Sequence, residues 1–300
     1  IVTNPDLARM RERQRRIETL SALFARQNRV YRIGYRLLYA AVDMCPDRLR
    51  VATGFTYANA YMFQGLVRTT ASAMGYTHRV SVVDVAPNGA AAKAGIQARD
   101  LFMKIDGWPV PYGEGAVTLA AAKLSDILTR EGRALLEFRR GASPYSVTIK
   151  PNYICDYRVL AVPGASIKAY ADGDQVVVFQ GLLEFVGDDD DHLASVIARE
   201  IANNLIPTMN IEADDGKSGL ANFFYWGMEP EASGDPTADQ IRAVDHQIAA
   251  DYVGAYLLAR AGFDHAKAPE FWYRLANAEV GGEGQNYPAP DPEYLLQLEA

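Results

Sequence analysis

The residues from Ile167 to Ala198 constrain the fold of this chain more than any other stretch. A short extended segment and a glycine turn lead into the β-branched run Val176-Val177-Val178, which favours a strand. Asp188 to Asp191 then form an acidic run of the kind that often begins a helix. The apolar sequence after this run predicts a helix that continues through Glu200.

Around Glu200 the predicted helix has the form of a zinc-peptidase helix that lacks its metal ligands. The active motif is H-E-x-x-H, in which two histidines one turn apart hold zinc and the glutamate acts as general base on the bound water. Here Arg199 and Asn203 stand at the histidine positions, and only Glu200 remains. A protonated guanidinium is not a zinc ligand and would repel the ion.

The sequence around this motif resembles the HtpX-type gluzincin metallopeptidases. Residues 167–203 follow that family's order N-A-x-A-D-G, V, G-L-L and D-D-x-L-A-x-V-x-A-H-E-x-x-H almost position by position. Residues 247–251 and 257–264 are similar to its later motifs E-x-x-A-D and L-x-x-A-G-Y-D. The resemblance implies an α+β fold in which a mainly helical zincin-like domain carries a small sheet.

The same resemblance places the third zinc ligand at Gln247, so the three former ligand positions are Arg199, Asn203 and Gln247. We expect no metal or other cofactor, because the four histidines of the chain are poorly placed to rebuild the site. As a hypothesis, the Arg199 guanidinium replaces the cation, is neutralised by Glu200 or Asp251, and has Gln247 as a hydrogen-bond partner. Glu200 itself is either a vestigial general base or a salt-bridge partner.

The middle of the chain, residues 51–150, is similar to PDZ domains of the bacterial protease type. A strand, a short alanine-rich helix ending at Gly95, and a hairpin around Asp106-Gly107 follow one another in the order of that family. The expected elements are a strand at 82–85, a short helix at 90–96, strands on both sides of residues 106–107, a longer helix at 119–128, and a hairpin of 134–138 with 145–149.

PDZ domains bind an extended peptide as an added strand, and a glycine-containing loop receives the terminal carboxylate. The candidate loop here is Phe63-Gln64-Gly65-Leu66. Residues 51–76 are equally compatible with a helix that covers the groove. The module is therefore either an open peptide-binding domain or a rigid spacer that docks to other proteins.

The N-terminal part of the chain is predicted to be helical, because apolar residues from Ile17 to Leu38 recur at spacings of three, four and seven. The arginines between Arg9 and Arg16 could attract an anionic membrane surface, but the pattern favours a solvated helix face. The family resemblance implies that residues 1–50 and 151–300 form one peptidase-like domain, which the PDZ-like module interrupts.

Comparison with soluble relatives of this family implies a disulfide between Cys45 and Cys155, which would clamp the base of the inserted module. The alternative is two buried free thiols. A disulfide would place the protein in an oxidising compartment such as the bacterial periplasm or cell envelope. The chain begins at Ile1, so we expect export followed by removal of a signal segment.

The charge of the chain argues against nucleic acid as a partner, and its hydropathy argues against a membrane-spanning helix. The net charge of −7 provides no basic surface for nucleic acid, and no apolar run is long enough for a transmembrane helix. Residues 207–239 contain an aromatic cluster, Phe223 to Trp226, which is either a protein-interaction surface or a flap over the vacant cleft.

These observations favour a catalytically inactive metallopeptidase homologue over an enzyme. We expect a protein-binding adaptor, or a subunit of a larger envelope complex, that binds partners or peptides through its PDZ module or through residues 207–239. The alternative is a zinc-dependent endopeptidase of the HtpX type with non-standard ligands, in which Glu200 activates the water.

Overall fold

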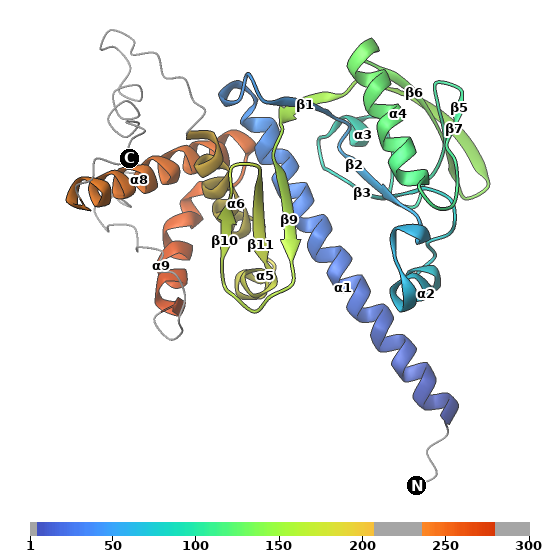
Figure 1. Cartoon of the computed structure of the whole chain (residues 1–300), viewed down its shortest axis with the longest axis horizontal. Helices are drawn as coiled ribbons and strands as arrows, with labels where there is room; N and C mark the ends of the chain where they lie inside the picture. The colour runs from blue at the N-terminus through green and yellow to red at the C-terminus, as the bar shows by residue number, and fades with distance from the viewer. Residues whose placement is uncertain (1–4, 207–235, 280–300) are drawn as a thin grey trace. The chain divides into compact units, whose positions relative to one another are not determined.

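The computed structural model describes residues 5–206 and 236–279 (Figure 1). The chain forms two compact units, one made of residues 1–32 and 50–154 and the other of residues 33–49 and 155–300. The first helix, α1 (Pro5–Ala40), begins in the first unit and ends in the second. Both units mix helices and strands, as the sequence predicts.

The first unit is built on an antiparallel sheet in the spatial order β2-β3-β4-β6-β7, and β5 pairs with β4. The strands are β2 (Phe55–Ala58), β3 (Ser81–Val85), β4 (Leu101–Ile105), β5 (Trp108–Pro109), β6 (Ala134–Arg140) and β7 (Ser143–Ile149). The helices are η2 (Ala60–Met62), α2 (Gly65–Ala73), α3 (Ala90–Lys93) and α4 (Ala116–Glu131). A separate pair of strands, β1 (Leu49–Ala52) and β8 (Asn152–Cys155), lies where the chain enters and leaves this unit.

Local sequence signals explain these elements, and the elements predicted for the middle module are confirmed. Asp106 and Gly107 have φ angles of 45° and 78°, as a tight hairpin turn between β4 and β5 requires. Helix α4 ends at Gly132, which has a φ of 65° and donates its N–H to the carbonyl of Leu128.

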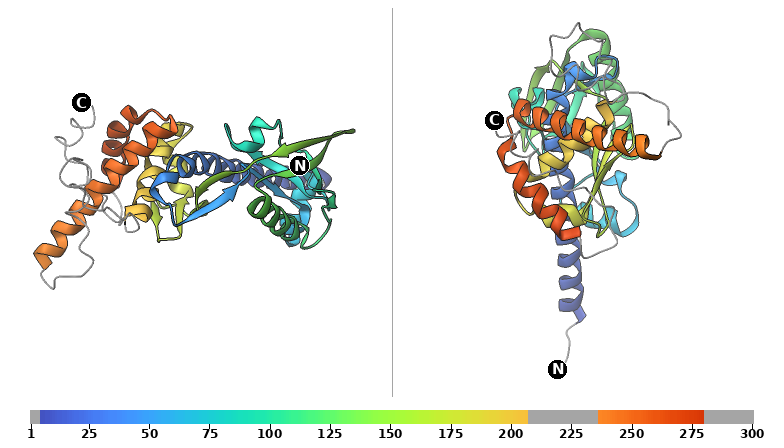
Figure 2. Two further views of the ribbon diagram at one scale, coloured as in Figure 1. Left: turned by 90° about the horizontal axis from the view of Figure 1, so that it is seen from above. Right: turned by 90° about the vertical axis from the view of Figure 1, so that its left-hand side faces the viewer.

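The core of the first unit lies between α4 and one face of the sheet (Figures 1 and 2). Leu124 and Leu128 of α4 are buried against a group of aromatic rings from the strands. Phe102 stacks on Phe138 with ring centroids 5.0 Å apart, and Phe55 meets Phe102 edge-on. Burial of such rings supplies much of the free energy that holds a small domain together.

The N-terminal helix is divided between the two units: residues up to Arg32 group with residues 50–154, and residues from Ile33 group with residues 155–300. The ring of Phe24 lies 5.4 Å from Phe63 and 5.6 Å from Tyr76. Arg32 also donates two hydrogen bonds, of 3.0 and 3.1 Å, to the Asp84 carboxylate on β3. These long-range contacts join residues 1–32 to the unit that contains residues 50–154.

The second unit combines a small sheet with several helices. In the sheet, β11 (Gln175–Phe179) lies between β10 (Ala169–Ala171), which is antiparallel to it, and β9 (Arg158–Val162), which is parallel. The helices are the end of α1, η1 (Val42–Met44), α5 (Gln180–Val186), α6 (Asp190–Leu205), α8 (Pro236–Ala261), η4 (His265–Lys267) and α9 (Ala268–Glu279).

The strand and the acidic helix start predicted at 167–198 are confirmed. The carboxylate of Asp189 caps α6 by accepting the backbone N–H groups of Asp191 and His192 at 2.9 and 3.2 Å. Most residues of α6 after this first turn are buried, so the helix lies at the centre of the unit. No helix between residues 5 and 206 or between 236 and 279 is long and apolar enough to cross a membrane.

Candidate functional site

The backbone of α6 approaches that of α8 most closely at Arg199. A Cβ atom at Gly254 of α8 would lie only 3.1 Å from the backbone nitrogen of Arg199 and 3.2 Å from its Cα. The glycine therefore permits the two helices to pack against each other without a side chain between them. This contact holds Arg199 and Asp251, one turn before Gly254, in the same part of the unit.

Arg199 is buried and ion-paired. Its Nε lies 2.7 Å from Oδ1 of Asp251, and its guanidinium lies over the ring of Trp272 at 4.9 Å from the centroid. Its side chain is only 7% exposed. The structure therefore places a permanent cation beside the carboxylate of Asp251, one of the two partners that the sequence hypothesis named for it.

Burial perturbs both carboxylates of this site. The low-dielectric surroundings raise the pKa of Asp251 to about 6, although the charge of Arg199 acts in the opposite direction. Burial also raises the pKa of Glu200, against the hydrogen bond from Asn203 and the charge of Arg199. Both carboxylates therefore depend on neighbouring donors and on Arg199 to remain ionised.

Glu200 is held by hydrogen bonds within the unit. It accepts one of 3.1 Å from Nδ2 of Asn203 and another from the backbone N–H of Ala171 on β10. The side chain of Asn203 thus supports the glutamate. The bond from Ala171 ties α6 to β10, an edge strand of the small sheet.

Asn204 is a further residue of this region that the sequence analysis missed. Its Oδ1 accepts the N–H of Gly173 at 2.7 Å, and its Nδ2 donates to the carbonyl of Gln175 at 3.2 Å. The hydroxyl of Tyr157 donates to the backbone carbonyl of Asn204 at 3.1 Å. The signal was the Asp172-Gly173 turn, whose backbone groups need a partner when α6 covers them.

The residues present do not fit a zinc ion. Gln247, the third of the ligand positions expected from the sequence, is half-buried on α8, one turn before Asp251. His192 stacks on Phe271 with ring centroids 5.0 Å apart, at the other end of α6 from Asn203. In the described parts of the chain, no three side chains of His, Cys, Asp or Glu converge in a way that could hold a metal ion.

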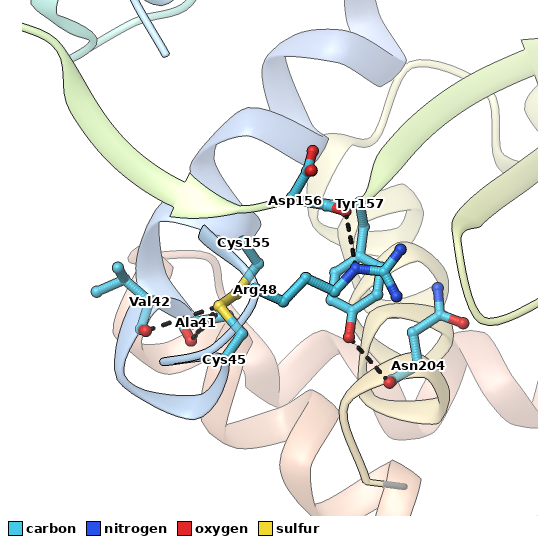
Figure 3. The surroundings of a disulfide bond; sticks show 8 residues. All are labelled: Ala41, Val42, Cys45, Arg48, Cys155, Asp156, Tyr157 and Asn204. Carbon is cyan, nitrogen blue, oxygen red and sulfur yellow. Dashed lines mark hydrogen bonds between the residues drawn. A yellow bond between two sulfur atoms is a disulfide. The ribbon is translucent and has the colours of Figure 1, made fainter. Parts of the chain in front are cut away.

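Cys45 and Cys155 form a disulfide in the second unit, as predicted, so the alternative of two free thiols is wrong (Figure 3). Both residues are buried, with exposures of 2% and 0%. Arg48 lies beside them, donates to the carbonyl oxygens of Asp156 and Gly173 at 3.1 and 2.7 Å, and covers the ring of Tyr157 (Figure 3). The bond joins the segment before the first unit to the segment after it.

The predicted carboxylate loop, residues 63–66, occupies a different place from the one expected. Phe63 packs its ring against Phe24 and Tyr76, and Gln64 is the N-cap of α2, which begins at Gly65. These residues therefore lead into a helix, whereas a carboxylate-binding loop leads into the strand that receives the peptide. The pattern Φ-x-G-Φ alone could not distinguish the two.

One of the two edge strands of the sheet is β2, the other being β7, and residues 53–54 precede β2. Gly54 has a φ of 80°, and its carbonyl accepts the N–H of Ala86 at 2.7 Å. The carbonyl of Thr53 accepts the N–H of Ala91 at 2.8 Å. On its other side β2 pairs with none of the described strands. The sequence signal was Thr53-Gly54-Phe55 immediately before an alternating strand.

The aromatic cluster at Phe223 to Trp226 lies outside the described residues, so its two interpretations stay open. The site that the structure does bring together consists of Arg199, Asp251, Glu200 and Asn203.

Comparison with solved structures finds PDZ-containing proteins that match about a third of this chain. The PDZ domain of HtrA3 bound to a phage-derived ligand (FGRWV) is 23% identical, with a TM-score of 0.27, and the match covers 35% of this chain and 89% of that one. The HtrA-type protease AlgW with a decapeptide is 18% identical, with a TM-score of 0.26, over 35% of this chain and 30% of that one. A PDZ domain protein from Parabacteroides distasonis is 19% identical, with a TM-score of 0.25, over 37% of this chain and 22% of that one.

This chain therefore spans less than a third of the length of the last two proteins. No protein-family model matches the chain, and no curated protein matches it.

Proposed function

We propose that this protein is a non-catalytic homologue of the HtpX-type metallopeptidases that acts as a protein-binding adaptor, or as a subunit of a complex, in the bacterial cell envelope. The observation that carries the proposal is the buried ion pair of Arg199 with Asp251 at the former metal position. A PDZ-like module in the first unit supplies the binding activity.

The ion pair favours this function because it replaces both the charge and the cross-link that zinc would provide. Zinc holds a peptidase helix pair together through three ligands, and its loss removes a large contribution to folding. Here the guanidinium of Arg199 on α6 meets the carboxylate of Asp251 on α8 instead. Glu200, which would have to contact a metal-bound water, accepts hydrogen bonds from Asn203 and Ala171.

The edge of β2 supports peptide binding. An extended peptide can continue the sheet there by pairing with β2, the end strand in the order of the first unit. Thr53 and Gly54 lie at the start of this strand, where backbone N–H groups would receive a terminal carboxylate. The buried disulfide is consistent with an oxidising compartment such as the periplasm.

The metal-free scaffold is tested by the zinc content of the purified, folded protein, measured by elemental mass spectrometry at neutral pH. We expect less than about a tenth of an equivalent, because no ligand set replaces the three lost positions. About one equivalent, lost on the change Glu200→Gln or Asp251→Asn, would contradict the proposal and favour a zinc-dependent endopeptidase with unusual ligands.

The binding activity is tested by selecting peptides with free C-termini from a phage-displayed library on the full chain. We expect enriched sequences whose affinity falls at least about tenfold when the terminal carboxylate is replaced by an amide, since the loop before β2 then loses its charged ligand. Leu66→Ala, at an exposed position of the rejected loop, should leave the affinity unchanged. Failure to enrich any carboxylate-dependent sequence would contradict peptide binding without affecting the zinc result.

A further inference from the structure

The first turns of α1 contact no other part of the described chain closely enough to be buried. Residues 6–15 are all exposed, whereas the same helix is packed against the first unit from Leu20 onward. Figure 2 shows these turns as a helix that extends past the sheet of its own unit. An isolated helix of this length is only marginally stable in water, so a surface that binds it would stabilise it.

This free segment has an uncovered apolar stripe. Leu7 and Met10 are 51% and 67% exposed, and Ile17 follows on the same side of the helix. The spacings of three and seven residues continue the face through which Phe24 packs on Phe63 and Tyr76. The apolar face of α1 therefore extends beyond the part that the first unit covers.

Two arginines beside this stripe have no anionic partner. Within the segment, Arg9 pairs with Asp6 at 3.7 Å, and Glu12 pairs with Arg15 and Arg16 at 2.9 and 3.8 Å. Arg11 and Arg13 have no carboxylate partner among the described residues. At about 100° per residue, they lie on opposite sides of the stripe, each roughly 70 to 90° from its centre. Both can therefore reach toward one flat surface that contacts Leu7 and Met10.

We propose that residues 6–17 of α1 bind the surface of an anionic phospholipid bilayer, with Leu7, Met10 and Ile17 at the acyl boundary and Arg11 and Arg13 at the headgroup phosphates. A narrow apolar stripe bordered by arginines is typical of helices that lie in the membrane interface. The segment has five arginines against two acidic residues, in a chain whose net charge is −7, so the attraction is concentrated at this end.

Charge also argues against a second copy of the chain as the occupant. Two such segments, each with this excess of positive charge, would repel when paired along their stripes. An acidic protein is the other source of negative charge. The lipid surface fits better because both unpaired arginines flank the stripe, and a planar surface engages the two flanks at the same time.

The test is co-sedimentation of the full chain with phosphatidylcholine vesicles that contain or lack phosphatidylglycerol, at physiological salt. We expect binding only to the anionic vesicles. The double change R11Q/R13Q should lower the partition coefficient by about 30-fold, because each arginine near an anionic surface contributes about the same amount to the binding free energy. L7N/M10N should weaken it by at least about tenfold through lost apolar burial.

The matched control is R133Q/R139Q, which removes the same charge from two exposed positions of the first unit and should leave binding unchanged. Circular dichroism checks that each variant keeps its fold. No sedimentation of the unmodified chain with anionic vesicles would overturn the proposal, as would an equal loss in the control pair. Binding to poly-L-glutamate alone would identify an acidic polypeptide instead. A dimer in sedimentation equilibrium that L7N/M10N dissociates would identify a second copy.

Discussion

At the scale of single residues, Arg199 and Asp251 form a buried ion pair between α6 and α8 of the second unit. Each has a buried charge that the other neutralises, so removal of one partner leaves the other uncompensated in a low-dielectric site. The distance of 2.7 Å does not itself measure the stability of the pair, because desolvation opposes the Coulomb attraction. The decrease in the free energy of unfolding when one partner is removed shows how far the unit depends on the pair.

We predict that Arg199→Ala lowers the free energy of unfolding by about 3 to 5 kcal/mol, since Asp251 is then buried without a cation. The double variant R199M/D251L should lose less than either R199A or D251N, because it leaves no unpaired charge. Urea unfolding of the unmodified protein and of each variant gives these free energies. Arg130→Ala breaks an exposed pair with Asp126 and should cost less than about 1 kcal/mol. A cost for R199A as small as that of R130A would show that the buried pair is not structural.

The raised pKa of Asp251 predicts an unusual dependence of stability on pH. The folded pKa is about 6, above the ordinary value of 3.8, so between these values the unfolded chain loses its proton while the folded chain keeps it. The contribution of Asp251 is therefore complete below about pH 4 and is lost as the pH rises through 6. Glu200, whose pKa burial also raises, acts in the same direction, and Arg199 opposes both.

We expect the urea midpoint of the unmodified protein to fall between pH 5 and pH 7 relative to that of Asp251→Asn, because the asparagine does not titrate. The difference in the free energy of unfolding between the two proteins should change by no more than about 1.4 kcal/mol per pH unit, which is the limit when one proton is bound or released. Glu200→Gln tests the second carboxylate in the same way. Parallel pH profiles for the unmodified protein and D251N would contradict the raised pKa.

At the scale of elements, the contact of α6 with α8 depends on the missing side chain of Gly254. A larger residue there would meet the backbone of Arg199 and push the helices apart. We predict that Gly254→Val lowers the free energy of unfolding by about 1 to 3 kcal/mol, as overpacking of a tight contact does. Ala259→Val, an exposed position on the same helix, controls for the lower helix propensity of valine. Equal midpoints for the two variants in urea would contradict the close approach.

Elements specified by neighbouring residues could be predicted from the sequence. Asp106-Gly107 defines its hairpin because few residues adopt those φ angles, and Asp189 caps α6 because its own side chain reaches the next backbone N–H groups. The grouping of α1 with the first unit could not be predicted, since it depends on contacts of Phe24 with residues about 40 and 50 positions away. The edge strand β2 was missed for a similar reason, because pairing order is not a local property.

The same distinction between local and long-range information applies to the candidate site. The motif around Glu200 specified which residues share a helix face, and spacing placed Asp251 one turn after Gln247. The partners of Glu200 and Asn204 come from the turn and strand at 171–175, so only the folded chain reveals them. The position of α6 over this turn decides which polar groups need a partner.

At the scale of the whole molecule, the chain leaves the second unit after Leu49, forms most of the first unit, and returns at Cys155. The Cys45–Cys155 disulfide closes this excursion, and the two cysteines have a sequence separation of 110. The bond therefore holds together two segments of the second unit that are otherwise far apart along the chain. A cross-link over so long a loop removes much conformational freedom from the unfolded state.

We predict that the double change C45S/C155S lowers the free energy of unfolding of the second unit by about 3 to 5 kcal/mol. Hydrogen exchange measured by mass spectrometry along a urea series should report this loss in peptides around Tyr157, whose ring lies under Arg48 beside the disulfide (Figure 3). The first unit should keep its midpoint, since its core residues lie between positions 55 and 149 and include neither cysteine. Phe138→Ala, in that core, is the opposite control, because it should lower the unfolding midpoint of the first unit and leave that of the second unchanged. A decrease in the unfolding midpoints of both units in C45S/C155S would show that the two units unfold as one.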